Sequence, residues 1–369
     1  MKKIDNWLAL LRAPGLTPDQ YHQLLNVFGS PHRALAASTA SLARLGLKTE
    51  TIQYIQNTGA DDIAPDLDWL QHDDHHVISL HDARYPELLK TIPSAPPLLF
   101  VRGDPDFLQL PQLAMVGSRT PTAAGRQTAT DFARHLSQAG ITITSGLARG
   151  IDAASHHGAL DCLAGTVALV AHGLDIVYPA ENRKLAEAIS QNGAIVTEHP
   201  IGTRPLKAYF PRRNRIISGM SLGTLVVEAA PRSGSLITSK HALEQGREVF
   251  AIPGSIHNPL ARGCHQLIRQ GAKLVETASD ILEELSALLP AELPRQRQPD
   301  ADARNDNQSS LILDPDHQKL LKCLAYEPTP MDELVNRSGF AASEVASMLL
   351  ILELEGCVVS ESGLYTRVA

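Results

Sequence analysis

Between residues 113 and 275, short apolar runs alternate with amphipathic stretches, and many runs end in glycine or serine. Examples are LAMVGSR (113–119), ITITSGLARG (141–150) and GTLVVEA (223–229). Strands buried on both faces are apolar throughout, and alternation with helices is typical of parallel sheets. We therefore expect an α/β fold with a Rossmann-like, doubly wound parallel sheet. We interpret RNRIISGMS (213–221) as one of its strands.

The flanking segments predict two smaller modules. Residues 1–70 read as short helices, with Thr17 as a helix cap before Pro18 and Gly29 as a stop. Their outline is that of a helix-hairpin-helix or SAM-like domain, although a plain packing bundle fits equally well. The expected division is 1–70, a sheet domain at 75–290, a polar linker at 291–310, and a winged helix at 311–369 made of three helices and a hairpin.

The net charge and the cysteine spacing indicate which ligands and which cellular compartment to expect. The formal net charge is -7, and residues 311–369 hold nine Asp and Glu against four Lys and Arg. The four cysteines have no metal-binding spacing, so we expect free thiols in a reducing cytoplasm, with no metal and no membrane segment. The histidine-rich run 72–76 reads more readily as a surface loop than as a metal site.

Three glycine- and serine-rich turns follow predicted strands. Because parallel strands end at one edge of a sheet, these turns are predicted to converge on a shared ligand. Their amides, hydroxyls and arginines suit a phosphate. A dinucleotide cofactor is not expected, because the first turn is not GxGxxG and the second strand ends in Thr144 and Ser145 rather than in an acid. The candidate binding residues in the turns are Gly117, Ser118, Arg119 and Thr120, then Gly146, then Ser233, Gly234 and Ser235.

A basic stretch, KAYFPRRNR (207–215), precedes the apolar run at 216. Cations beside an aromatic side chain are typical of proteins that bind single-stranded nucleic acid. The alternative is a solvated loop with the aromatic ring in the core. The candidate binding residues here are Lys207, Phe210, Arg212, Arg213 and Asn214, whereas Arg215 is held back as a structural anchor.

Several motifs together resemble the DNA-processing protein A family (DprA, also called Smf). They are MVGSRTPTAAG, SGLARGIDAASHHGAL, GLDIVYPAENRKL, FPRRNRIISGMS, SGSLITSKHALEQGREVFAIPG and LIRQGA. The resemblance implies a protein without catalytic residues or cofactor that binds single-stranded DNA regardless of sequence, protects it during natural transformation, loads the RecA recombinase and dimerises through the Rossmann-like domain. It also implies that Arg119, Lys207 and residues 210–213 contact the strand, with Lys184 or Arg183 extending the path.

Two other functions stay open at this stage. A nucleoside-monophosphate phosphoribohydrolase-like enzyme would carry a PGGxGTxxE turn, but SGSLITSK (233–240) lacks the carboxylate. A nucleotide-sensing interaction module is the second. The last helix of the winged helix carries Glu344, Glu353 and Glu355 and no Lys or Arg, which favours a regulatory or protein-binding role, or a dispensable one, over DNA reading.

Overall fold

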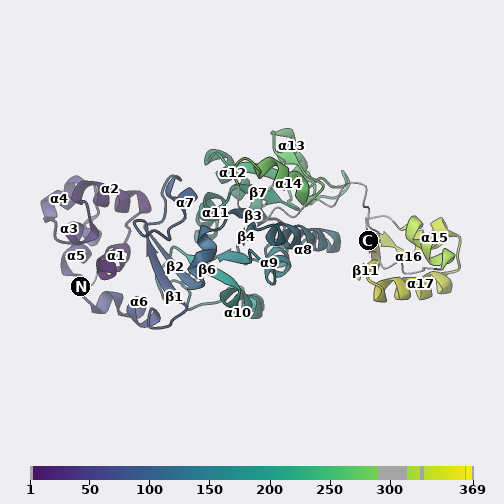
Figure 1. Ribbon diagram of the computed structural model, residues 1–369, viewed down its shortest axis with the longest axis horizontal. Coiled ribbons are helices and arrows are strands. Elements are labelled where there is room, and N and C mark those ends of the chain that lie inside the picture. Colours follow the sequence, from purple (N-terminus) through teal and green to yellow (C-terminus); the bar gives the residue numbers. More distant parts are fainter. Residues whose placement is uncertain (1–2, 290–313, 325–327, 362, 368–369) are drawn as a thin grey trace.

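The computed structural model describes residues 3–289, 314–324, 328–361 and 363–367. A group of short helices, a helix-covered sheet and a small winged helix follow one another along its long axis (Figure 1). The predicted linker at 291–310 lies outside the described residues, and the domain boundaries stay a prediction.

The central sheet has the order β1-β2-β6-β5-β4-β3-β7-β8-β9. From β6 to β9 neighbouring strands run parallel, whereas β1 and β2 join one edge antiparallel. The predicted α/β class with a mostly parallel sheet is thus confirmed, and the antiparallel edge was not foreseen. The strands are β1 (His75–Ser79), β2 (Leu98–Gly103), β3 (Gln112–Val116), β4 (Thr142–Ser145), β5 (Thr166–Leu169), β6 (Gly193–Thr197), β7 (Gly223–Val226), β8 (Glu248–Ala251) and β9 (Lys273–Leu274).

Helices cover both faces of this sheet because alternate strand residues point to opposite sides. Leu113 and Met115 of β3 belong to one apolar core, and Ala114 and Val116 to another. The Leu113 face is covered by α8 (Ala123–Gln138), α9 (Ile151–Ala159) and α14 (Ala278–Leu285). The opposite face is covered by α7 (Glu87–Lys90), α11 (Tyr209–Met220), α12 (Ser235–Glu244) and α13 (Arg262–Arg269).

The strand predicted at 213–221 is wrong, because residues 213–220 belong to α11 and Ser221 follows that helix. Ile216, Ile217 and Met220 are buried at helical spacing and pack with Leu89 of α7. A short apolar run fits a buried strand and a buried helix face equally well, so the sequence pattern alone could not separate them.

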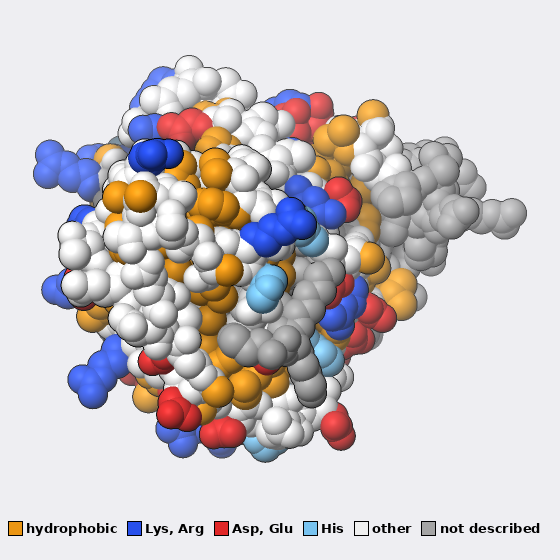
Figure 2. Space-filling view, turned by 90° about the vertical axis from the view of Figure 1, so that its left-hand side faces the viewer, with side chains coloured by type: hydrophobic (Ala, Val, Ile, Leu, Met, Phe, Trp, Pro, Cys, Tyr) orange, Lys and Arg blue, Asp and Glu red, His pale blue; other side chains and the backbone are white. Residues whose placement is uncertain are grey.

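The N-terminal helices pack against the antiparallel edge of the sheet, which β1 and β2 form. Thr17 caps α2 and Gly29 ends it in a left-handed conformation, as predicted. Trp7 and Phe100 share one apolar core, to which α10 (Arg183–Gln191) also contributes. The helices are α1 (Lys3–Leu11), α2 (Pro18–Phe28), α3 (Pro31–Leu35), α4 (Thr39–Arg44), α5 (Thr49–Asn57) and α6 (Ala64–Trp69). On this end of the molecule Lys and Arg stand apart from one another, mixed with acidic and uncharged side chains (Figure 2).

The winged helix contains the predicted three helices and hairpin, with Gly363 in the turn at φ 78°. A short additional strand, β10, completes a sheet of order β10-β12-β11. The elements are α15 (Pro315–Cys323), β10 (Thr329–Pro330), α16 (Met331–Ser338), α17 (Ala342–Leu354), β11 (Val358–Glu361) and β12 (Leu364–Arg367). Across the described ranges of the chain, no helix is long and apolar enough to span a bilayer.

Candidate nucleic-acid interface

The three predicted turns follow β3, β4 and β7, which are neighbours in the sheet. The order of strands reverses between β3 and β7, and ligands of doubly wound sheets bind at such a point. The Ile151 amide donates to the Ser118 carbonyl oxygen at 3.0 Å, and the Ser118 amide donates to the Glu228 carbonyl oxygen at 2.7 Å. These bonds join the segments that follow the three strands at one edge of the sheet.

Hydrogen bonds fix the first turn, which carries the exposed cation Arg119. Thr122 caps α8 by accepting from the Gly125 amide at 2.9 Å, and its own amide and hydroxyl donate to the Glu228 carboxylate at 2.9 and 2.8 Å. The Thr120 amide donates to the Ser118 hydroxyl at 3.1 Å. Arg119 and Thr120 are exposed on this frame.

The second turn rests on a buried arginine. Arg213, from α11, is 5% exposed and donates to the Gly146 carbonyl oxygen at 3.0 Å. A Cβ at Gly146 would lie 1.8 Å from the Arg213 guanidinium, so the close approach requires glycine. The Asp152 carboxylate accepts from the Gly146 and Ala148 amides at 3.2 and 3.3 Å.

This burial changes the expectation for Arg213. The site was predicted to present it to a ligand, but its side chain lies beneath the turn and positions the Gly146 backbone. Desolvation lowers the pKa of Arg213 to about 10, with Asp152 acting in the opposite direction. Burial likewise raises the pKa of Asp152, which Arg213 partly offsets.

Most of the basic stretch lies in helix α11, so its side chains point to different sides of the helix and differ in exposure. Lys207, just before the helix, and Arg212, in it, are exposed, whereas Phe210 is half-buried. The Asn214 side-chain amide donates to the Gly234 carbonyl oxygen at 3.4 Å, which joins α11 to the third turn. Arg215 donates to Glu198 at 2.5 Å.

The Arg215–Glu198 pair lies in the interior, with side chains 12% and 11% exposed. Desolvation raises the pKa of Glu198 although Arg215 opposes the shift. The anchoring role expected for Arg215 is thus seen as an ion pair that fixes α11 to the segment after β6.

The third turn forms the N-terminus of α12. The Ser233 and Ser235 hydroxyls lie 2.7 Å apart, and the Ser235 amide donates to the Ser233 hydroxyl at 3.3 Å. Gly234 and the preceding Arg232 are exposed. The turn therefore offers a small, polar surface at the same edge.

The loop at 178–184 lies next to the second turn. The Asn182 side chain donates to the Leu147 carbonyl oxygen at 2.9 Å, and Arg149 pairs with Glu181. Lys184 is exposed at the start of α10. We call the turns 117–120, 146–149 and 233–235, with segment 207–214 and loop 178–184, the strand-end rim.

The sequence analysis missed Tyr178. Its side chain is 49% exposed, and its ring centroid lies 5.7 Å from that of Phe210. The only signal in the sequence was an aromatic residue in a polar loop, 32 positions from its partner. Together the two rings form an aromatic corner on the rim.

The rim is electropositive although the chain is acidic. Arg119, Lys207 and Arg212 on the rim are exposed, as is Arg232 just before its third turn, and no carboxylate in the described ranges forms a salt bridge with them. Exposed cations without internal partners remain available to an anion.

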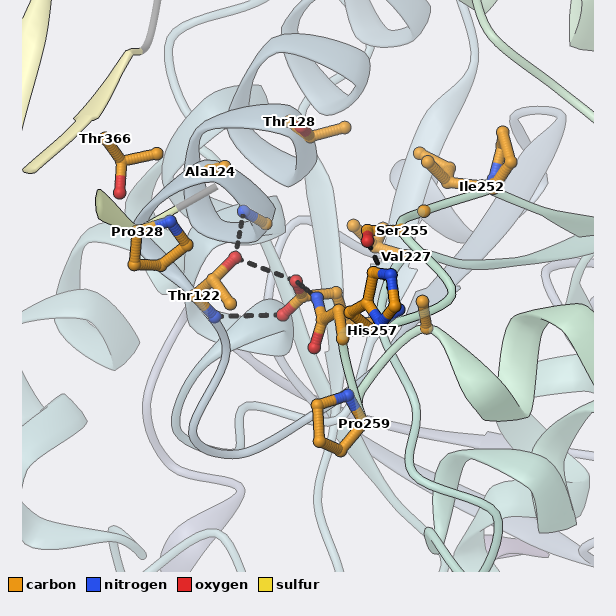
Figure 3. Close-up of a pocket in the computed structure, with 16 residues that line it drawn as sticks. Thr122, Ala124, Thr128, Val227, Ile252, Ser255, His257, Pro259, Pro328 and Thr366 are labelled. Carbon is orange, nitrogen blue, oxygen red and sulfur yellow. Dashed lines mark hydrogen bonds between the residues drawn. The ribbon is translucent and has the colours of Figure 1, made fainter. Parts of the chain in front are cut away.

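Beside the rim lies a cavity of about 550 Å³ (Figure 3). Thr122, Glu228 and His257 line it from the sheet domain, and Pro328 and Thr366 from the winged helix. The Glu228 carboxylate already accepts from Thr122 and, at 3.4 Å, from Asn258, so it is committed to holding the α8 cap. Within the described residues, no group of His, Cys, Asp or Glu could hold a metal ion.

Comparison with known proteins identifies the family. The profile of "DNA recombination-mediator protein A" matches residues 76–286, and that of the "DprA winged helix domain" matches 299–363. The chain belongs to the DprA/Smf family. Protein Smf of Escherichia coli K12 is 41% identical over 334 residues, covering 88% of this chain and 86% of that protein.

Two solved DprA structures are similar in fold. DprA from Streptococcus pneumoniae has a TM-score of 0.67 and 37% identity, covering 77% of this chain and 99% of that one. DprA from Helicobacter pylori, described for its single-stranded DNA binding mode, has a TM-score of 0.53 and 27% identity, covering 58% of this chain and 98% of that one.

His172 and Cys264 are both buried in the packing of the sheet domain. His172 is 2% exposed, donates from Nδ1 to the Gly173 carbonyl oxygen at 2.9 Å and lies edge-on to Tyr178. Burial lowers its pKa. Cys264 is fully buried, and this burial raises the pKa of its thiol to about 12.

Proposed function

We propose that this protein binds single-stranded DNA along the strand-end rim. The observation that carries the proposal is the convergence of exposed, unpaired cations and an aromatic corner at the switch point of the sheet. The DNA-binding relative from Helicobacter pylori supports it. The residues proposed to contact or shape the strand path are Gly117, Ser118, Arg119, Thr120, Gly146, Lys184, Lys207, Phe210, Arg212, Asn214, Ser233, Gly234 and Ser235, with Tyr178 added and Arg213 reassigned to positioning.

Different side chains on the rim then bind different parts of the DNA strand. Arg119, Lys207 and Arg212 neutralise phosphates, and hydroxyls of the first and third turns hold phosphate oxygens. Phe210 and Tyr178 offer ring faces to bases, which every base can stack on. Contacts to the backbone and to ring faces carry no base-edge information, so we propose recognition independent of sequence.

Because the chain belongs to this family, we also propose a wider role. The protein would protect incoming single strands in the cytoplasm during natural transformation and recombination, and pass them to the RecA recombinase. It would act as a homodimer formed through the Rossmann-like domain. Neither role requires a catalytic residue or a cofactor, and Glu228 and Asp152 beside the rim accept from backbone and side-chain donors.

Competition binding tests the function directly. A labelled single-stranded oligonucleotide is titrated with the full chain, and unlabelled single strands, duplex of equal length and adenosine monophosphate compete. We expect single strands of different base composition to compete alike and duplex to compete weakly. Preferential competition by duplex would refute the proposal, and base release from the mononucleotide would establish the enzyme alternative instead.

A variant pair locates the site. Arg119→Ala should weaken single-strand binding. Arg134→Ala is the control, since Arg134 is also partly exposed but lies near the far end of α8, a 16-residue helix that begins at the rim. Equal affinities for the two variants would move the site away from the rim.

A further inference from the structure

The last helix of the winged helix, α17, carries large apolar side chains on its exposed side as well as in the core. Val345, Met348, Leu349 and Leu352 fill the core of this module. Leu350, Ile351 and Leu354 point outward and are 60%, 42% and 81% exposed. The other exposed positions of the helix are small or polar, and the described residues leave these three large apolar side chains uncovered.

The three exposed side chains form one patch. Leu350 and Leu354 are one turn apart and therefore lie on the same side of the helix, with Ile351 beside them. Pairs at this spacing are the usual anchors when a helix docks into a partner. The rest of this chain approaches the winged helix elsewhere, because Pro328 and Thr366 face α8 across the cavity. In Figure 1, α17 runs along the lower edge of the winged helix.

The charges around the patch exclude nucleic acid as its ligand. The helix has no Lys or Arg, and Glu353 and Glu355 stand on either side of Leu354 in the sequence. Glu353 accepts from the Ser360 hydroxyl at 2.6 Å, and no cation in the described part of the chain forms a salt bridge with either glutamate. Phosphates would be repelled where a winged helix normally inserts its recognition helix into a groove.

We propose that the outer face of α17 docks a protein segment that carries apolar side chains next to Lys or Arg. The apolar residues would cover Leu350, Ile351 and Leu354, and the cations would complement Glu353 and Glu355. A second copy of this chain is the poorer occupant. A two-fold contact places the same patch on both partners and would bring like charges together.

Site-directed cross-linking in the full chain identifies the occupant. A photoreactive phenylalanine analogue replaces Leu350, and a matched probe replaces Leu163, which is 70% exposed on the sheet domain. After irradiation in cells, mass spectrometry maps the attached segment. We expect a protein segment with apolar side chains and a net positive charge, attached at 350 and not at 163.

The mapped segment is then made as a labelled peptide and titrated with the full chain. Leu354→Ser should weaken binding about ten-fold or more, as expected for a central apolar anchor. Glu355→Lys should weaken binding and reduce its salt dependence, and Leu163→Ser should change neither. Melting temperature and single-strand affinity should remain those of the wild type, because the patch is exposed and none of its residues belongs to the rim.

Several outcomes would overturn the proposal. Cross-links to DNA or to a second copy of this chain would do so, as would no attachment specific to position 350. Peptide binding that survives both Leu354→Ser and Glu355→Lys would also do so.

Discussion

The ion pair between Arg215 and Glu198 should be the main electrostatic anchor of α11. Replacing Arg215 by methionine keeps most of the apolar stem but leaves Glu198 buried without its partner. Breaking a pair of this kind costs about 3–5 kcal/mol of unfolding free energy. Because α11 also carries Phe210 and Arg212, the same change should weaken single-strand binding.

The unfolding free energy lost on Arg215→Met should depend on pH. Burial already raises the pKa of Glu198, and loss of Arg215 raises it further. A carboxyl whose pKa is higher in the folded state binds more protons there, so stability falls as pH rises above about 4.3. The destabilisation by Arg215→Met should therefore be larger at about pH 8 than at about pH 5.

Urea unfolding in a double-mutant cycle measures the effect. Glu198→Gln combined with Arg215→Met should be less destabilised than the sum of the single variants, because no charge is left buried. The control is Arg149→Met, which breaks an exposed pair with side chains 60% and 62% exposed and should cost under about 1 kcal/mol. A cost for Arg215→Met as small as that of the control, or strictly additive variants, would refute the reasoning.

Three further predictions concern the rim and the core beneath it. Gly146→Ala should lower the unfolding free energy by about 1–3 kcal/mol and weaken single-strand binding, because its Cβ displaces Arg213; an unchanged urea midpoint would contradict this. Tyr178→Ala and Phe210→Ala should each weaken single-strand binding by about 1–3 kcal/mol while leaving its salt dependence unchanged. His156 is fully buried with a pKa lowered to about 3, so stability should fall as pH drops below about 6.5, by at most about 1.4 kcal/mol per pH unit for this group. His156→Gln should flatten that slope in pH-dependent urea unfolding.

The sequence predicts the framework of the site because it follows from topology. Parallel strands end at one edge, so the turns after β3, β4 and β7 had to meet there. The cap at Thr17 and the stop at Gly29 were likewise readable, since both depend on local backbone chemistry.

The direction of individual side chains could not be read in the same way. The helical phase of α11 turns Arg212 outward and Arg213 inward, and the strand assignment of 213–221 concealed this. Tyr178 meets Phe210 only through tertiary packing. The antiparallel strand β2 was hidden in a proline-rich stretch, because pairing with β6 is a long-range property.

The salt dependence of single-strand binding tests the central claim most directly. Each phosphate contact on a single strand adds about 0.7 to the slope of log affinity against log salt. Lys207→Ala and Arg212→Ala should each reduce the slope by about that amount, and the double variant by about twice as much. Arg134→Ala should leave it unchanged. Slopes equal to that of the wild type in both rim variants would contradict the account.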